Sequence, residues 1–217
     1  MLTIHHLGRS QSERIIWLCE ELGLPYALTI YGRDPKTTLA PPALTALHPM
    51  GAAPVITEGD MMLAESGAIT EYILAKYGQG RLVVPPDAPG FAEYLYWFHF
   101  ANGNLQPVLG RGMILRRVQL PPDNPVQSAM QGRLDRVLAL VEARLTTHAY
   151  LAGPFTAADI MSVFSLTTMR LFMPVDLAPY PHPRLPRPYR RPAGLSARHG
   201  GRGSGLYAHA ELTACTW

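Results

Sequence analysis

The chain has 217 residues, of which 47% are hydrophobic and 16% charged, and its formal net charge is +3. This composition suffices for a buried core, and no apolar run reaches the ~18 residues of a membrane helix. The N-terminus lacks the apolar segment of a signal peptide, and just two cysteines are present, Cys19 and Cys215. We therefore expect a cytoplasmic protein without a membrane partner. Because the positive charge lies in the arginine-rich tail, we expect no nucleic-acid partner.

The first 78 residues predict a small α/β unit. Strand-like runs over 2–7 and 26–31 flank a helical apolar repeat over 10–23, and this β-α-β order is typical of a parallel strand pair. Cys19 falls on the apolar face of that helix, where we interpret it as a core thiol. Two short strands separated by a tight turn, and one helix, complete the unit over 53–57, 61–65 and 66–77.

Residues 79–90 are rich in Gly and Pro and predict a linker, after which the apolar repeat becomes purely helical. We expect one long helix or a kinked pair over about 91–118, with bends at its glycines and proline, and another helix over about 125–148. A third begins at FTAADIMSVFSL, where Thr156 and Asp159 form a capping box. The predicted fold class is therefore α/β followed by all-α, with an α/β domain over 1–78 and a helical domain over 91–178.

Residues 179–217 form an irregular tail that does not continue the helical pattern. Six prolines between positions 179 and 192 are incompatible with a helix, and Gly, Arg and Ser dominate after them. Two interpretations stay open: a basic extension without fixed structure, and a shifted reading frame that has replaced the final helices. Translation of the gene in its other two frames distinguishes them.

The turn before the first helix reads LGRSQSER and carries two serines. Ser10 and Glu13 fit the S-x-x-E capping box, so Ser10 can serve simply as a helix cap. The same geometry also has a chemical use, because a hydroxyl beside the free N–H groups of a helix N-terminus can donate to a thiolate. The turn contains no cysteine, so the thiol would belong to a ligand.

Two other turns offer contacts for such a ligand. Pro54 begins a strand, where a cis X–Pro bond would leave the Val55 backbone free to pair with an extended peptide; an ordinary trans proline is the alternative. Ser66 and its N–H groups at a helix start suit a carboxylate, and Glu65 suits an ammonium; a plain helix cap is the alternative. Carboxylate, ammonium, extended backbone and thiolate together describe glutathione.

With these motifs the chain resembles the cytosolic glutathione S-transferases, and among them the bacterial serine-type enzymes related to the theta and delta classes. The resemblance covers about residues 1–178 and is carried by S-Q-S-E-R, H-P-M-G-A-A-P-V, E-S-G-A-I and L-A-G-P-F-T-A-A-D-I. It implies a thioredoxin-like N-terminal domain, a helical C-terminal domain, a homodimer, glutathione as co-substrate and no metal.

The resemblance also assigns residues of the glutathione site. In theta- and delta-like enzymes the active serine lies four residues before the arginine of the first helix, which points to Ser10, with Ser12 as second choice. Arg14 is then expected to be a structural ion-pair residue. The predicted glutathione contacts are Val55, Glu65, Ser66, Pro54, Ser12 and His48.

Two features depart from the family pattern. Many members carry a lysine two residues before the cis-proline, where this chain has Ala52; Lys36 and His48 are the candidate replacements. The tyrosine that other classes carry in the first strand is absent, and His5 and His6 stand there. We interpret both histidines as structural residues.

The resemblance places the electrophile pocket beside the first long helix of the second domain. The stretch YLYWFHFANGN would supply an apolar wall with polar tips, although the same stripe is also typical of a core or a dimer face. The residues predicted to line this pocket are Tyr94, Trp97, Phe98 and Asn102.

The sequence thus predicts a glutathione transferase that joins the glutathione thiolate to small hydrophobic electrophiles, or reduces peroxides with it. Ser10 would stabilise the thiolate and would not act as a nucleophile. One alternative is a glutathione-dependent isomerase of the zeta kind, which the S-Q-S turn disfavours because S-S-C is typical of it. Another is a transferase-like binding or regulatory module without turnover, which Ala52 and the tail leave open.

Overall fold

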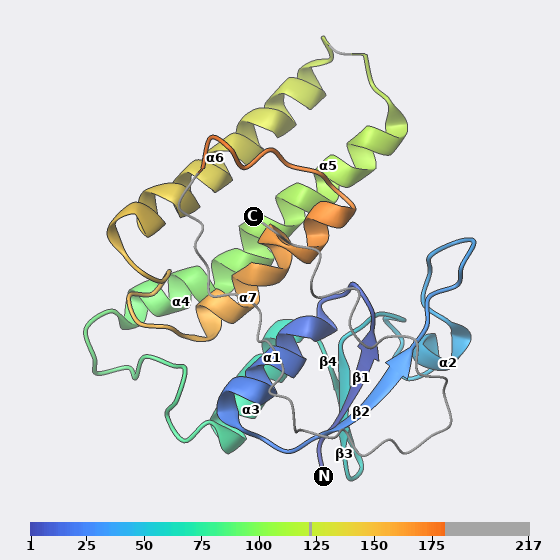
Figure 1. The fold of residues 1–217 in the computed structure, drawn as a ribbon, viewed down its shortest axis with the longest axis vertical. Coiled ribbons are helices and arrows are strands. Elements are labelled where there is room, and N and C mark those ends of the chain that lie inside the picture. The colour runs from blue at the N-terminus through green and yellow to red at the C-terminus, as the bar shows by residue number, and fades with distance from the viewer. Residues whose placement is uncertain (122, 181–217) are drawn as a thin grey trace.

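The computed structural model describes residues 1–121 and 123–180 (Figure 1). Its N-terminal part holds a four-stranded sheet with the strand order β2-β1-β3-β4. The predicted parallel pair is confirmed, because β1 is parallel to β2, while β3 is antiparallel to both β1 and β4. The strands are β1 (Thr3–Leu7), β2 (Ala27–Tyr31), β3 (Val55–Glu58) and β4 (Met61–Ala64).

Helices α1 (Ser12–Leu22) and α3 (Ser66–Tyr77) contact each other and pack on the sheet, α1 against β1 and α3 against β3 and β4. Figure 1 shows both on the same side of the sheet, and it shows the short α2 (Pro42–Thr45), which the sequence did not predict, on the other side. Cys19 is fully buried on the apolar face of α1, and burial together with Glu20 raises the pKa of its thiol to about 12. Its interpretation as a core thiol is confirmed.

The C-terminal part of the described chain is helical, and the expected order of an α/β unit followed by an all-α unit is confirmed. The predicted helix over 91–118 is one continuous helical run whose middle is π-helical. Pro107 lacks an N–H to donate to the preceding turn, which accounts for a change of hydrogen-bond pattern at this place. The elements are α4 (Phe91–Phe100), η1 (Ala101–Leu105), α5 (Gln106–Val118), α6 (Pro125–Thr147), α7 (Ala157–Leu166) and the 3-10 turn η2 (Thr168–Leu171).

Helix α7 is the buried centre of the molecule, since every one of its residues is buried. It contacts α4 and α5 within the helical part and α1 in the N-terminal part, so it joins the two (Figure 1). The predicted capping box at its start is confirmed: Ala158 N–H donates to Thr156 Oγ1, and Thr156 N–H donates to Asp159 Oδ2. The domain boundaries at positions 78 and 90 stay predictions.

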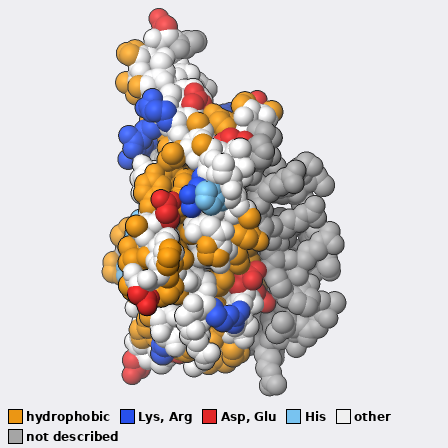
Figure 2. All heavy atoms as spheres, turned by 90° about the vertical axis from the view of Figure 1, so that its left-hand side faces the viewer, with side chains coloured by type: hydrophobic (Ala, Val, Ile, Leu, Met, Phe, Trp, Pro, Cys, Tyr) orange, Lys and Arg blue, Asp and Glu red, His pale blue; other side chains and the backbone are white. Residues whose placement is uncertain are grey.

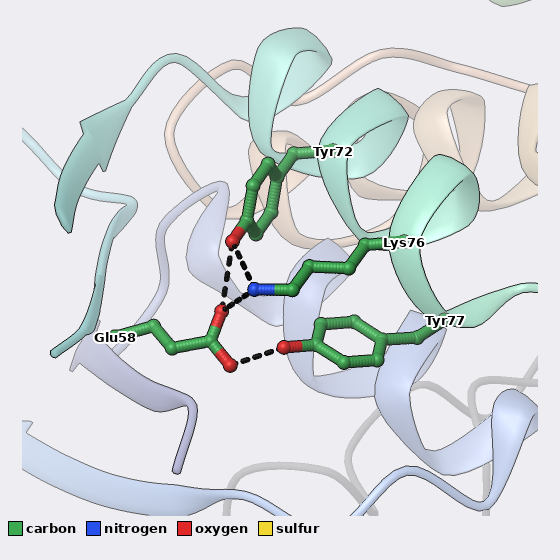
Figure 3. Close-up of polar contacts among 4 residues, drawn as sticks. All are labelled: Glu58, Tyr72, Lys76 and Tyr77. Carbon is green, nitrogen blue, oxygen red and sulfur yellow. Dashed lines mark hydrogen bonds and ion pairs between the residues drawn. The ribbon is translucent and has the colours of Figure 1, made fainter.

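A polar cluster fixes the end of β3 against the last turns of α3 (Figure 3). Lys76 Nζ lies 2.8 Å from Glu58 Oε2, Tyr72 donates to the same oxygen over 2.8 Å, and Tyr77 donates to Oε1. These contacts, the Lys76 bond first, lower the pKa of Glu58 to about 2. The cluster is a structural tie between strand and helix.

Among the helices of the described residues, none is both long enough and apolar enough to cross a membrane. The two interpretations of the tail concern residues 179–217, of which 181–217 lie outside the described part of the chain.

Candidate functional site

Three turns named in the sequence analysis meet at one edge of the sheet. β1 ends, β3 begins and β4 ends at this edge, because β3 runs antiparallel to both neighbours. The turn with Ser10 follows β1, Pro54 precedes β3, and Glu65 and Ser66 follow β4. The fold therefore brings the predicted anion, backbone and ammonium contacts to one place.

Ser10 precedes the N-cap residue Gln11 of α1, which begins two residues later than predicted, at Ser12. Ser10 is 8% exposed, and its Oγ accepts a hydrogen bond from Ser12 N–H over 3.3 Å. Glu13 N–H donates to the Ser10 carbonyl oxygen, and the Glu13 carboxylate accepts from Thr168 Oγ1 over 2.6 Å. The hydroxyl of Ser10 thus lies at the helix N-terminus in an arrangement that differs from the predicted capping box.

The prediction that Ser12 contacts glutathione does not fit the structure. The Ser12 side chain is completely buried, and its Oγ lies 2.7 Å from Ser10 Oγ and 2.8 Å from His6 Nδ1. A hydroxyl enclosed by protein groups in this way cannot also contact a ligand. Ser12 instead lies between Ser10 and His6.

The Ala53–Pro54 peptide bond is cis, as predicted. The assignment of Val55 is wrong, because Val55 is fully buried and belongs to the inner strand β3, with β1 on one side and β4 on the other. Ala53 precedes the strand and is partly exposed, and among residues 1–121 and 123–180 its backbone makes no hydrogen bond to another residue. The backbone that remains free to pair with a ligand is therefore that of Ala53.

Glu65 and Ser66 open α3 in different ways. Glu65 is exposed and has a φ of 73°, which is rare for a residue with a side chain and is found preferentially at functional sites. Ser66 is buried, and its hydroxyl donates to Gln11 Oε1 while it accepts from Arg14 Nη1 and Asn102 Nδ2. Because these three bonds saturate the hydroxyl, an anion at this place must use the N–H groups of the first turn of α3.

Arg14 is 1% exposed and lies at the centre of a polar cluster between the sheet unit and the helices. Within the described residues it forms no ion pair, so the predicted ion pair is wrong. Burial lowers the pKa of the Arg14 guanidinium to about 9, and its Nε has no hydrogen-bond partner among the described atoms. The cluster holds the cation with neutral oxygens only: those of Gln11 (2.9 Å), Ser66 (3.1 Å), Asn102 (2.7 Å), Gln106 (2.8 Å) and Ser165 (3.5 Å).

Comparison with known proteins identifies the family. Residues 9–76 match the family model described as Glutathione S-transferase, N-terminal domain. The chain is 31% identical over 179 residues to Glutathione S-transferase 3 of Schizosaccharomyces pombe, a match that covers 76% of this chain and 73% of that protein. It is 32% identical over 194 residues to Glutathione S-transferase GstB of Escherichia coli (strain K12), covering 85% and 90%. The chain belongs to the glutathione S-transferase family.

A solved structure supports the same assignment. The crystal structure of a glutathione S-transferase from Actinobacillus pleuropneumoniae is 31% identical to this chain, with a TM-score of 0.76, and the match covers 84% of this chain and 83% of that one. The fold class expected for a glutathione S-transferase, a thioredoxin-like N-terminal domain followed by a helical domain, is thereby confirmed.

The predicted electrophile pocket of this glutathione S-transferase needs correction. Tyr94, Trp97 and Phe98 are only 3–6% exposed and belong to the hydrophobic core, so they do not form the wall of an open pocket. Asn102 lies in the π-helical segment and is engaged with Arg14 and Ser66. An aromatic stripe at helical spacing fits a core as well as a pocket, and here it is core.

His48 and Lys36, the candidate replacements for the missing lysine, lie on the loops before β3. His48 Nδ1 accepts a hydrogen bond from Met50 N–H over 3.2 Å, so this ring holds the turn that leads to the cis bond. Lys36 is exposed, as is Ala52. Within the described parts of the glutathione S-transferase, no group of three or more His, Cys, Asp or Glu side chains that could hold a metal ion comes together.

Proposed function

We propose that this glutathione S-transferase binds glutathione across the three turns and transfers its thiolate to small hydrophobic electrophiles, with peroxide reduction as a second reaction of the same thiolate. One observation carries the proposal. Ser66 Oγ donates to Gln11 Oε1 over 2.9 Å and thereby joins the N-terminus of α3 to that of α1, directly beside Ser10. A ligand with a carboxylate at one end and a thiolate at the other can therefore use two helix N-termini at once.

The arrangement suggests how glutathione lies. Its γ-glutamyl carboxylate would accept hydrogen bonds from the N–H groups at the start of α3, and its ammonium would contact the exposed carboxylate of Glu65. Its cysteinyl backbone would pair with the free N–H and C=O of Ala53, in place of Val55. The sulfur would then lie at Ser10. In this proposal residues 1–78 bind glutathione, and residues 91–178 supply the electrophile side of the site.

In this reaction the protein mainly has to stabilise the thiolate form of glutathione. A thiol with an ordinary pKa of ~8.5 is mostly protonated at neutral pH, so the site must favour the thiolate. The thiol releases its proton to water, the Ser10 hydroxyl donates to the sulfur, and the dipole of α1 adds to the stabilisation. One such hydrogen bond to an anion is worth ~1.5–3 kcal/mol, or roughly tenfold to a hundredfold in rate. The thiolate then forms a bond to the electrophilic carbon, whose leaving group departs with the bonding electrons.

The test is Ser10→Ala, assayed with glutathione and a chlorodinitrobenzene, together with the pKa of the bound thiol from the ultraviolet absorbance of the thiolate. We expect kcat/KM to fall roughly tenfold to a hundredfold, with glutathione affinity much less changed. Ser128→Ala, an exposed serine on α6, is the matched control. An unchanged thiol pKa in Ser10→Ala would contradict the mechanism. Glutathione binding by the wild type without turnover of any electrophile would favour the binding-module alternative.

We also propose that the protein is a cytoplasmic homodimer that pairs through the outer face of α4. A hollow of about 500 Å³ lies on this face, and Leu95 and Tyr96 are 38% and 49% exposed there. Figure 2 views the side of the molecule that α4 occupies in Figure 1 and shows hydrophobic side chains gathered on it. Exposed apolar side chains around a hollow are typical of a surface that a partner covers. The residues that line the hollow are Ala92, Leu95, Tyr96, His99, Phe100, Gly103 and Asn104.

A further inference from the structure

A chain of hydrogen bonds runs from His6 through Ser12 to Ser10. His6 Nδ1 lies 2.8 Å from Ser12 Oγ, and Ser12 Oγ lies 2.7 Å from Ser10 Oγ. The middle member is completely buried, so bulk water does not compete for its bonds. The proposed function uses only the outermost hydroxyl, that of Ser10, and assigns no role to the two groups behind it.

The hydroxyl of Ser12 can form only a limited number of these bonds at once. It has one proton to donate and two lone pairs that accept. Leu7 N–H donates to it over 3.3 Å and occupies one lone pair. The Leu7 carbonyl oxygen, at 3.3 Å, is a competing acceptor for the Ser12 proton. His6 Nδ1 at 2.8 Å and Ser10 Oγ at 2.7 Å lie closer, so the short bonds favour an arrangement in which the second lone pair and the proton serve His6 and Ser10. The chain can therefore run in either of two directions.

The direction of the chain decides what Ser10 offers to a ligand. If His6 Nδ1 carries a proton, it donates to Ser12, and Ser12 donates to Ser10. The Ser10 oxygen then accepts from both the hydroxyl and the N–H of Ser12, and its own proton is free for a thiolate. If Nδ1 is unprotonated, it accepts a hydrogen bond from the Ser12 hydroxyl, and Ser12 accepts one from the Ser10 hydroxyl. Ser10 then presents only lone pairs to a ligand, and these repel an anion.

The imidazole of His6 is expected to be neutral at pH 7 and therefore to carry one N–H. Burial, with the nearby positive charge of Arg33 as a second cause, lowers the pKa of His6 to about 4. Arg33 is itself held at this place, because it donates to the carbonyl oxygens of Gly8 and Arg9 in the turn before Ser10. A neutral imidazole has its proton on either Nδ1 or Nε2, so the tautomer of His6 sets the direction of the chain.

We infer that His6 is a positioning residue of the transferase reaction: with its proton on Nδ1 it orients the hydroxyl of Ser12, which in turn directs the proton of Ser10 toward the glutathione sulfur. This inference rests on the proposed function, in which Ser10 donates to the thiolate. It revises the sequence-based interpretation of His6 as a purely structural residue and leaves that of His5 in place.

The experiment compares three substitutions in the full chain. His6→Leu removes the donor, His6→Asn puts an amide N–H where Nδ1 stood, and His5→Leu is the matched control, because the His5 ring bonds Tyr31 and Thr57 instead of the serine turn. We expect His6→Leu to raise the pKa of bound glutathione thiol by about half a unit to one unit and to lower kcat/KM roughly three- to tenfold. His6→Asn should restore most of both losses. His5→Leu should leave the thiol pKa unchanged even where it lowers the melting temperature.

A second measurement needs neither a variant nor glutathione. Nitrogen-15 NMR of the histidine side chains in the wild type distinguishes a protonated Nδ1 from a protonated Nε2. We expect His6 to carry its proton on Nδ1. A proton on Nε2 would overturn the inference, whether or not His6→Leu folds.

The outcomes separate this inference from the function on which it rests. If Ser10→Ala raises the thiol pKa and His6→Leu does not, the inference is wrong and the proposed function stands. If Ser10→Ala also leaves the thiol pKa unchanged, the thiolate role of Ser10 fails, and the role of His6 fails with it. If both substitutions raise the thiol pKa and His6→Asn reverses the change, the inference is supported.

Discussion

Arg14 Nη1 lies 3.1 Å from Ser66 Oγ, so a buried cation on α1 is hydrogen-bonded to the residue that opens α3. The same guanidinium donates to Asn102 and Gln106 in the helical part of the chain. One side chain therefore connects both helix N-termini of the proposed glutathione site to the helices behind them. Among the described residues it forms no ion pair, although the Glu13 carboxylate acts on its pKa from nearby. Its positive charge adds to the dipole of α3, which favours an anion in front of Ser66.

Arg14→Met should destabilise the protein by about 2–4 kcal/mol, because several buried oxygens lose their donor at once. Urea unfolding measures this change in the free energy of unfolding. Arg14→Lys keeps the charge but cannot reach the oxygens of both the N-terminal part and the helical part of the chain. We expect its free energy of unfolding to lie between those of wild type and Arg14→Met, and its affinity for glutathione to be lower than that of wild type.

The control for Arg14 is Arg111→Met, which changes an exposed arginine on α5. It should alter the free energy of unfolding by less than about 0.5 kcal/mol. If Arg14→Met proved as stable as the wild type, the polar cluster would not hold the two parts of the chain together, and the structural role given to Arg14 would have to be abandoned.

Glu65 combines a strained backbone with an exposed carboxylate, so its substitutions should separate an effect on stability from an effect on glutathione binding. Its φ of 73° suits glycine better than a residue with a Cβ. We expect Glu65→Gly to be more stable than Glu65→Ala by about 1 kcal/mol, because both lose the carboxylate and only glycine relieves the backbone. Both should bind glutathione roughly tenfold or more weakly, as calorimetry can measure, if the carboxylate contacts the ammonium.

Glu65→Gln is the matched variant for binding, since it keeps an oxygen acceptor on a side chain of the same length. It should retain more affinity than Glu65→Ala. Equal affinities of wild type and Glu65→Ala would show that the ammonium of glutathione lies elsewhere, and the backbone of Glu65 would then need another explanation.

Elements with strong local signals could be predicted from the sequence. The helix predicted over 66–77 has the same bounds in the structure, and the capping box of Thr156 and Asp159 forms as expected. At Pro54, a proline at a strand start after a loop, the sequence left a cis and a trans bond open, and the structure has the cis bond. In each case the deciding residues lie within a few positions of one another.

The partners of Arg14 could not be predicted, because they depend on the tertiary fold. Gln11, Asn102 and Gln106 are neutral amides from different elements, and neither charge nor periodicity marks them. The assignment of the free backbone to Val55 failed for a similar reason, because only the sheet order shows that β3 is an inner strand. The link from His6 to Ser12 likewise appears only once α1 is seen to begin at Ser12.

Leu95→Glu should convert the proposed homodimer into monomers, because it places a charge in the centre of the apolar face of α4. Sedimentation of both proteins at equal concentration measures the change. Ile114→Glu is the control, since Ile114 is an apolar residue that is 58% exposed on α5, and it should leave the dimer intact. A monomeric wild type would rule out the dimer, and a dimer that survives Leu95→Glu would place its interface on another surface.

Glu58 should make the stability of the protein depend on pH in the acid range. Its folded-state pKa is about 2, below the ordinary 4.5, so the unfolded chain takes up the proton first as the pH falls. The stabilisation from Glu58 is therefore fully present above pH 4.5 and is lost as the pH falls toward 2. Glu58→Gln removes this contribution, so its melting temperature should lie below that of the wild type at neutral pH, with a gap that narrows toward about pH 3. The control is Asp60→Asn, which changes an exposed carboxylate in the adjacent turn and should leave the melting temperature close to that of the wild type at either pH. If the difference in melting temperature between Glu58→Gln and wild type stayed the same across this pH range, the cluster in Figure 3 would stabilise the fold without its charge.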